Sequence, residues 1–271
     1  MKNFIYLVQG ESELIKNNFH LTGRNNADAI FLTYDKEIDN AIYFPNSTWS
    51  EGRNKLLEAA KEKGDYKYYI LCDDDIEFAK GNWDEFERLL LLHKPAIGCP
   101  LFPKTKGTNI SFLNIQVFLI NDEQMMAFHR DVIKDGIIVP YHEDLDKIMY
   151  WCSSYIQETL IQNLYRSDSL QFNTIEILNN KHDRYDKSNK LIFRKISDEW
   201  LTGEFLNNYK KRIDPKKHKI RIRIKILFYT IRFILYRKLK PPSFRIKKNN
   251  LLKILKHDSK LLKQYNNLNE E

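Results

Sequence analysis

Residues 68–78 read YYILCDDDIEF, an apolar and aromatic run that ends in three adjacent carboxylates. The run follows Gly64 and Asp65 and is too short for a helix with a full apolar face, so residues 68–72 are predicted to form a buried strand. Side chains alternate along an extended segment. We therefore expect Asp73 and Asp75 to point to one side of the strand and Asp74 to the other.

Three like charges at the end of a buried strand are costly unless something neutralises them. Carboxylate oxygens are hard ligands that suit Mg²⁺ or Mn²⁺, and proteins commonly share such ions with the phosphates of a substrate. The stretch therefore predicts a divalent-cation site at Asp73 and Asp75. The alternative is a solvated acidic turn, and the apolar residues that follow, Ile76 and Phe78, weigh against it.

The composition is that of a globular protein. The 271 residues suit one large domain with an appendage or two small ones, and 42% hydrophobic with 13% aromatic residues argues against disorder. The three cysteines lie far apart in apolar surroundings, which fits reduced thiols better than disulfides or a zinc site. The N-terminus lacks the pattern of a secretory signal. We therefore expect a cytoplasmic location.

The net charge of +8 is unevenly distributed. Residues 210–248 contain sixteen Lys or Arg and one acid, Asp214, so this segment carries +15 and the remainder of the chain −7. An acidic to neutral body with a basic tail is predicted. The body should have no general attraction for nucleic acid, while the tail could seek an anionic membrane or nucleic acid.

Predicted strands alternate with predicted helices over the first hundred residues, which indicates an α/β fold with a mostly parallel sheet. The predicted strands are 4–8, 29–34, 41–45, 68–72, 95–101, 125–129 and 172–178. The predicted helices are 49–61, 83–92 and 148–160. Residues 112–120 are expected to pair with 125–129 as an antiparallel hairpin.

Polar residues near the ends of these elements are further candidates for a site. Gln9 follows the first strand, where a nucleotide base or ribose could bind. Arg53 lies in the first turn of its helix, where the helix dipole disfavours a cation. It is expected either to face the acidic triplet or a phosphate, or to form a salt bridge with a neighbouring carboxylate. Asp74 is expected to brace the Arg53 side of the sheet.

Glu143, Asp144 and Asp146 stand before or at the start of the helix predicted within 148–160. They either cap this helix and compensate its dipole, or one of them acts as a general base. His182 lies in a polar loop after the strand 172–178. It is of interest only if the sheet brings it near Asp73 and Asp75.

The basic tail begins at about Tyr209. On a helix, the apolar residues between 220 and 235 form one stripe, with Arg221, Lys225 and Arg232 to one side. The longest uncharged run is far below the roughly 20 residues that a membrane span needs. Residues 216–248 are therefore predicted to contain an interfacial helix for anionic lipid. A helix packed on the protein's own body, or a subunit interface, is the alternative.

Residues 1–190 resemble the GT-A fold glycosyltransferases, which are α/β sandwiches with a DxD motif at the end of a strand. Asp73-Asp74-Asp75 is similar to that motif, and residues 49–60 resemble the helix that precedes it in family 2 members, with Gly52 in place of the usual Ala. The resemblance implies that Asp73 and Asp75 hold Mn²⁺ or Mg²⁺ against the diphosphate of a nucleotide sugar. It further implies His182 as a third metal ligand. Together with the positions of the residues in the chain, it leads us to expect donor contacts from Asp73, Asp74, Arg53 and Gln9.

The resemblance also implies a catalytic base, because inverting members carry an acidic pair before a helix. Glu143-Asp144 looks similar, although it lies closer to the DxD than usual, and Asp146 and Glu158 are competing candidates. Residues 9–11 differ from the usual P-x-Y-N loop, which leaves the nucleoside contacts open.

These expectations define an α/β GT-A sandwich at residues 1–208 and a basic, amphipathic, membrane-associating helical tail at residues 209–271. The expected function is metal-dependent transfer of a sugar from a nucleotide-sugar donor to a glycan or lipid-linked glycan, in bacterial surface polysaccharide synthesis at the inner face of the membrane. Two alternatives are a nucleotidyltransferase acting on a sugar phosphate and a non-catalytic binding module. A nucleotidyltransferase would need a Gly-rich phosphate loop with Lys or Arg, and residues 9–14 contain one Gly and no Lys or Arg. The second would use the tail to seek membrane or nucleic acid.

Overall fold

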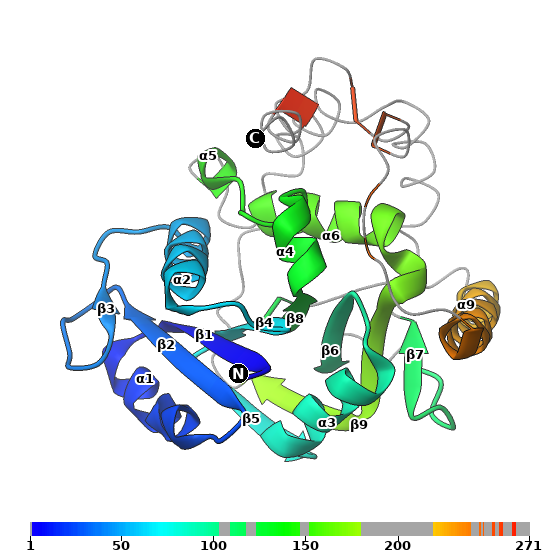
Figure 1. The fold of residues 1–271 in the computed structure, drawn as a ribbon, viewed down its shortest axis with the longest axis horizontal. Coiled ribbons are helices and arrows are strands. Elements are labelled where there is room, and N and C mark those ends of the chain that lie inside the picture. Colours follow the sequence, from blue (N-terminus) through cyan, green and yellow to red (C-terminus); the bar gives the residue numbers. More distant parts are fainter. Residues whose placement is uncertain are drawn as a thin grey trace.

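The computed structural model describes residues 2–102, 109–117, 123–146, 152–179 and 219–239, and in the tail residues 244, 246, 251–252, 255–256 and 262–263. Within these ranges one mixed sheet of nine strands forms the centre of the molecule. Helices α2, α4 and α6 lie on one side of the sheet, and α1 and α3 lie on the other (Figure 1). The predicted α/β class is confirmed.

The strands are β1 Phe4–Gly10, β2 Ala27–Thr33, β3 Ile42–Tyr43, β4 Tyr68–Asp73, β5 Ile76–Lys80, β6 Ile97–Leu101, β7 Ile115–Val117, β8 Met125–His129 and β9 Ser169–Asn179. The helices are α1 Ser12–Asn18, α2 Trp49–Lys63, α3 Trp83–His93, α4 Arg130–Asp135, α5 Glu143–Asp146, α6 Cys152–Leu164 and α9 Lys219–Leu239. Two short 3-10 helices are η1 Phe19–Gly23 and η3 Arg166–Asp168.

The strand order is β3-β2-β1-β4-β8-β6-β9-β5, with β7 paired to β9 off this path. The first four strands in this order are parallel. β8 is antiparallel to both of its neighbours, β4 and β6. β9 is long enough to pair with β6 and β7 along its first half and with β5 along its second. All seven residues of β1 are buried, as expected for a parallel strand covered on both faces.

The predicted hairpin between residues 112–120 and 125–129 is wrong. β7 pairs with β9, where Ile115 faces Phe172, and β8 pairs with β4 and β6. Every residue of β8 is buried, so this strand belongs at the centre of the sheet rather than in an edge hairpin. The strand predicted at residues 41–45 is also shorter, since only Ile42 and Tyr43 pair.

Helix α2 runs back from the edge at which the parallel strands end, so its first turns lie beside Asp73. Its N-terminus is fixed by a capping box. Thr48 Oγ1 accepts a hydrogen bond from Glu51 N at 3.2 Å, and the Glu51 carboxylate accepts one from Thr48 N at 2.8 Å. The helix ends at Gly64.

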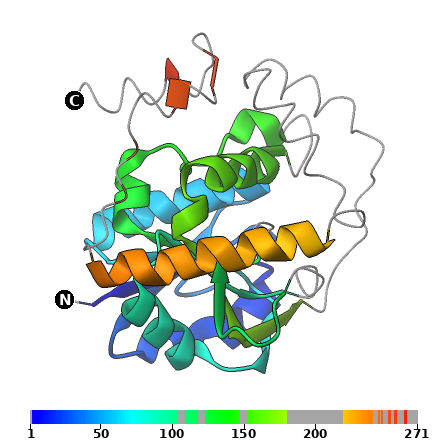
Figure 2. The same cartoon turned by 90° about the vertical axis from the view of Figure 1, so that its right-hand side faces the viewer.

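Helix α9 lies across the side of the molecule, next to β7 (Figure 2). Beyond it, Phe244 packs its ring edge-on against His129, with centroids 5.0 Å apart, and Ile246 N donates to Asp135 at 3.1 Å. The described parts of the tail thus contact the body. The boundary predicted between residues 208 and 209 falls outside the described residues. In the described part of the chain, every helix is too short or too polar to cross a bilayer.

Candidate active site

The parallel strands β1, β2 and β4 end side by side. In the sheet register Gln9 of β1 lies opposite Asp73 of β4, and Gly10 lies opposite Thr33 of β2. The carboxyl edge of a parallel sheet is where open α/β folds bind ligands. The acidic triplet therefore stands at the edge where a ligand is expected.

Arg53 of α2 contacts the end of β4 at this edge. It is fully buried, donates to Cys72 O at 2.8 Å, and forms an ion pair and a short hydrogen bond with Asp73. Its guanidinium also lies over the ring of Trp49, 5.1 Å from the centroid. The cation at the start of α2 is thus explained by a carboxylate at the end of β4.

Asp74 occupies a different position from the one expected. Its carboxylate accepts a hydrogen bond from Glu11 N at 2.6 Å, and its carbonyl accepts one from Asn18 Nδ2 at 2.7 Å. The expectation that Asp74 braces the Arg53 side is therefore wrong, since Asp73 does so. Gly10 makes the contact possible, because a Cβ there would lie 2.0 Å from Asp74 Cγ. Burial, with a smaller contribution from Asp75, raises the pKa of Asp74 to about 6.

Gln9 is buried, with 6% of its surface exposed, and its amide packs against α2. A Cβ on Gly52 would lie 2.4 Å from Gln9 Nε2, so a larger residue at this helical position would require the Gln9 amide to move. Gln9 Oε1 has no hydrogen-bond partner among the described residues.

Two residues after β2 belong to the same edge and were not predicted as site residues. Asp35 accepts hydrogen bonds from Ser12 N and Ser12 Oγ, both at 2.8 Å, which holds the start of α1. Tyr34 is 40% exposed. Burial of its hydroxyl, together with the negative charges of Asp74 and Glu11, raises the pKa of Tyr34 to about 12. Their position after a strand was a signal that sequence reasoning did not use.

A third residue that the sequence did not single out is Glu123, which precedes β8 and is 7% exposed. Burial raises its pKa well above the usual range, although the Ser154 hydroxyl and the charge of Arg53 oppose that shift. Glu158 of α6, a competing candidate for the base, is close enough to Glu123 to raise its pKa further.

The predicted acidic cluster of residues 143–146 forms its own short helix, α5. Asn54, the residue after Arg53, holds the segment in place. Its Nδ2 donates to Tyr141 O at 2.9 Å and to Glu143 Oε1 at 2.8 Å, and its Oδ1 accepts from Tyr141 N at 2.7 Å. Arg53 and Asn54 thereby join the acidic strand end to α5.

The three acids of α5 have different surroundings. Asp146 is 8% exposed and its Oδ2 accepts from Ser50 N at 2.7 Å, so it caps α2 rather than the helix that follows it in sequence. Burial raises its pKa, against the hydrogen bonds from Ser50. Glu143 is half-buried and Asp144 is exposed.

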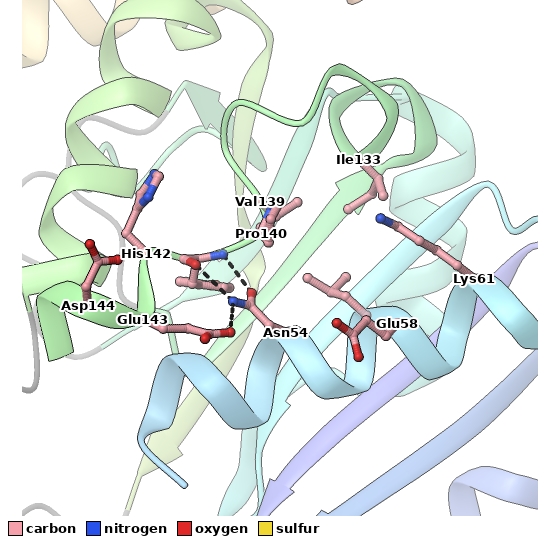
Figure 3. A pocket seen from close by; sticks show the side chains of 11 residues that line it. Asn54, Glu58, Lys61, Ile133, Val139, Pro140, His142, Glu143 and Asp144 are labelled. Carbon is pink, nitrogen blue, oxygen red and sulfur yellow. Dashed lines mark hydrogen bonds between the residues drawn. The ribbon is translucent and has the colours of Figure 1, made fainter. Parts of the chain in front are cut away.

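A cavity of about 310 Å³ lies between α2 and the segment that leads to α5 (Figure 3). Its polar wall includes Asn54, Glu58, Lys61, His142, Glu143 and Asp144, and its apolar wall includes Leu57, Ile133, Val139 and Pro140. The acidic triplet is not part of this lining. The candidate site thus has two halves, a strand end with aspartates and a cavity with Glu143 and Asp144, which meet at Arg53 and Asn54.

Asp73 and Asp75 suit a divalent ion that takes most of its ligands from other molecules. Asp73 and Asp75 are partly exposed carboxylates, and one oxygen of Asp73 is engaged by Arg53. Within the described ranges, no group of three or more His, Cys, Asp or Glu side chains could hold a metal by itself. Two hard carboxylates suit an ion that takes its other ligands from phosphate and water. His182 lies outside the described residues, so its role as a metal ligand stays a prediction.

The comparison with solved structures identifies the fold. The chain is similar to residues 1–349 of TarS from S. aureus in complex with UDP-GlcNAc, with 12% sequence identity, coverage of 89% of this chain and 76% of that chain, and a TM-score of 0.50. The fold is GT-A-like. A weaker likeness, with 12% identity, coverage of 73% and 98%, and a TM-score of 0.40, is found to CMP:2-keto-3-deoxy-manno-octonic acid synthetase complexed with CTP. No family model matches the sequence, and the comparison with curated proteins finds no match.

The GT-A-like fold agrees with the architecture predicted from the stretch at residues 68–78. The likeness concerns the fold alone, because the identity is low. What the site does chemically must be argued from this chain's own residues.

Proposed function

We propose that the protein is a metal-dependent glycosyltransferase. It would move a sugar from a nucleotide-sugar donor to a glycan or a lipid-linked glycan, in the synthesis of a bacterial surface polysaccharide. One observation carries the proposal: adjacent residues of α2, Arg53 and Asn54, bond Asp73 on one side and Glu143 on the other. The strand end, whose aspartates would bind a phosphate through a metal ion, is thereby joined to the cavity that contains the candidate general bases Glu143 and Asp144.

The donor half consists of the carboxyl edge of β1, β2 and β4. Asp75 and Asp73 would hold Mg²⁺ or Mn²⁺, which when bound supplies positive charge to a leaving nucleoside diphosphate. Arg53 fixes Asp73 through a buried ion pair, and Asp74 fixes the loop after β1 by accepting from Glu11 N. Tyr34, partly exposed at the same edge, offers a ring for a nucleoside.

The acceptor half is the cavity beside α5. An acceptor hydroxyl would lose its proton to the carboxylate of Glu143 or Asp144, while its oxygen bonds to the anomeric carbon of the donor and the bond from that carbon to the diphosphate breaks. Asp146 is the weaker candidate, because its Oδ2 accepts from Ser50 N in a buried position. The mixed apolar and carboxylate wall suits a sugar, which has both polar hydroxyls and apolar ring faces.

The test is nucleoside diphosphate release from UDP- and GDP-sugars with Mn²⁺ or Mg²⁺. Asp75→Asn should abolish release, and Asp144→Asn or Glu143→Gln should lower transfer by about 10²–10⁴-fold. Asp146→Asn, which keeps an oxygen for Ser50 N, should retain most of the activity. Glu62→Gln, on the exposed face of α2, is the control variant.

The opposite results are equally clear. Failure to bind any sugar nucleotide with either metal would refute the proposal. Consumption of a nucleoside triphosphate and a sugar phosphate, with pyrophosphate release, would instead make the protein a nucleotidyltransferase.

A further inference from the structure

Helix α9 has two different apolar faces. The first faces the body, where Ile226 is fully buried and Phe233 is 3% exposed. Between them Thr230 Oγ1 accepts a hydrogen bond from Val117 N of β7 at 3.0 Å, and it donates to Ile226 O at 2.7 Å. The Arg166 guanidinium of η3 lies 5.9 Å from the centre of the Tyr229 ring. Helix α9 therefore packs along β7 as part of the folded domain.

The second face points away from the body. Ile224, Phe228, Ile231 and Leu235 are 63%, 62%, 50% and 58% exposed. Their spacings of four, three and four place them on one line of a helix. We name these four residues the outer stripe. Of the ten large apolar side chains that are exposed in the described part of the chain, six belong to α9. Such a concentration marks an interaction surface rather than ordinary surface composition.

The charges on α9 restrict what can cover the outer stripe. The helix contains seven Lys or Arg and no Asp or Glu, and Arg223, Lys225 and Arg232 are exposed beside the stripe. A second copy that packed stripe on stripe would bring two basic rows together without acids on the helix to offset them. An anionic lipid surface offers both complementary charge and an apolar layer for the stripe.

We propose that the outer stripe of α9 is a membrane-binding face for anionic bilayers. The helix lies in the plane of the headgroups while Ile226, Thr230 and Phe233 keep it attached to the sheet. Because the helix is docked, binding holds the whole domain in one orientation to the lipid. The proposal goes beyond the proposed chemistry, and its test needs no catalytic activity.

The experiment uses the full chain and sedimentation with vesicles of phosphatidylcholine alone or with phosphatidylglycerol. The protein should bind the anionic vesicles, and added salt should weaken binding. Phe228→Ser with Leu235→Ser should weaken binding by at least about 10-fold, since two large side chains no longer enter the apolar layer. Arg223→Gln with Lys225→Gln should weaken binding to anionic vesicles and reduce its salt dependence, because two of the seven cations of α9 are lost.

Two controls keep the test decisive. Leu92→Ser removes an apolar side chain that is 61% exposed on α3, and it should leave vesicle binding unchanged. Circular dichroism should show that the stripe variants fold, because the altered side chains are exposed. Unchanged vesicle binding in Phe228→Ser with Leu235→Ser would overturn the proposal. So would a dimer in light scattering that the same variant dissociates, or retention on nucleic acid without binding to vesicles.

Discussion

Arg53 stabilises the site through a charge that is buried from water and bonded to the Asp73 carboxylate and to Cys72 O. Removing one partner of such a pair leaves the other charge poorly compensated. Arg53→Ala should therefore lower the free energy of unfolding by about 3 kcal/mol, measured by urea denaturation. Lys55→Ala removes a cation that is 47% exposed on the same helix, and it should change stability by less than about 0.5 kcal/mol. Equal effects of the two variants would contradict the role given to Arg53.

Asp35 provides a pH-dependent contact at the same edge. Burial would raise its pKa, but the hydrogen bonds from Ser12 outweigh this and hold the pKa of Asp35 below the usual value. Because the folded-state pKa is lowered, the contact stabilises the fold above the ordinary carboxyl range and is lost as pH falls through the lowered value. Carboxyl NMR titration should show this low pKa. Ser12→Ala removes the hydroxyl donor but keeps Ser12 N, so it should raise the pKa of Asp35 part of the way toward its ordinary value. A pKa unaffected by Ser12→Ala would refute this explanation.

At the scale of elements, α2 is the helix that organises the site. The side chains of Thr48 and Glu51 form a capping box at its N-terminus. The carboxylate of Asp146 in α5 accepts a further hydrogen bond from Ser50 N. Thr48→Ala should cost about 1 kcal/mol of stability. Asp146→Ala should cost a similar amount or more, whereas Asp146→Asn should cost less because an amide oxygen can still accept from Ser50 N. If Asp146→Asn and Asp146→Ala are equally destabilised in thermal unfolding, the capping role is wrong.

The elements also show how far sequence reasoning reaches. The strand ending at Asp73 and the helix carrying Arg53 were predictable, because an apolar run and a Ser/Thr start are local signals. The pairing of β7 with β9 was not, since the partner lies more than fifty residues later in the chain. Asp146 was expected either to cap the helix that follows it or to act as a general base, and its carboxylate instead accepts from Ser50 N at the start of α2, 96 residues earlier. β4 ends at Asp73, so strand alternation could not place Asp74 beyond it, and the carboxylate that forms the ion pair with Arg53 is that of Asp73.

At the scale of the whole molecule, the basic tail contributes to the stability of the body. Ile226 and Phe233 are buried against it, and Phe244 packs on His129. Removing residues 219–271 should therefore lower the unfolding free energy by about 5 kcal/mol, from the loss of several buried apolar side chains. Thermal unfolding of the shortened chain measures this. Phe228→Ser, on the outer stripe, is the matched variant that should leave stability nearly unchanged. A shortened chain as stable as the full one would show that the tail is independent.

The stacking of Arg53 on Trp49 has an optical consequence. Trp49 also meets Tyr141 edge-on, with ring centroids 4.8 Å apart, so its indole lies between the two halves of the candidate site. Indole emission depends on nearby charge and on the polarity around the ring. The molecule thus contains an intrinsic fluorophore whose signal follows any displacement of Arg53 or Tyr141, and Trp49→Phe would separate that signal from the emission of the other three tryptophans.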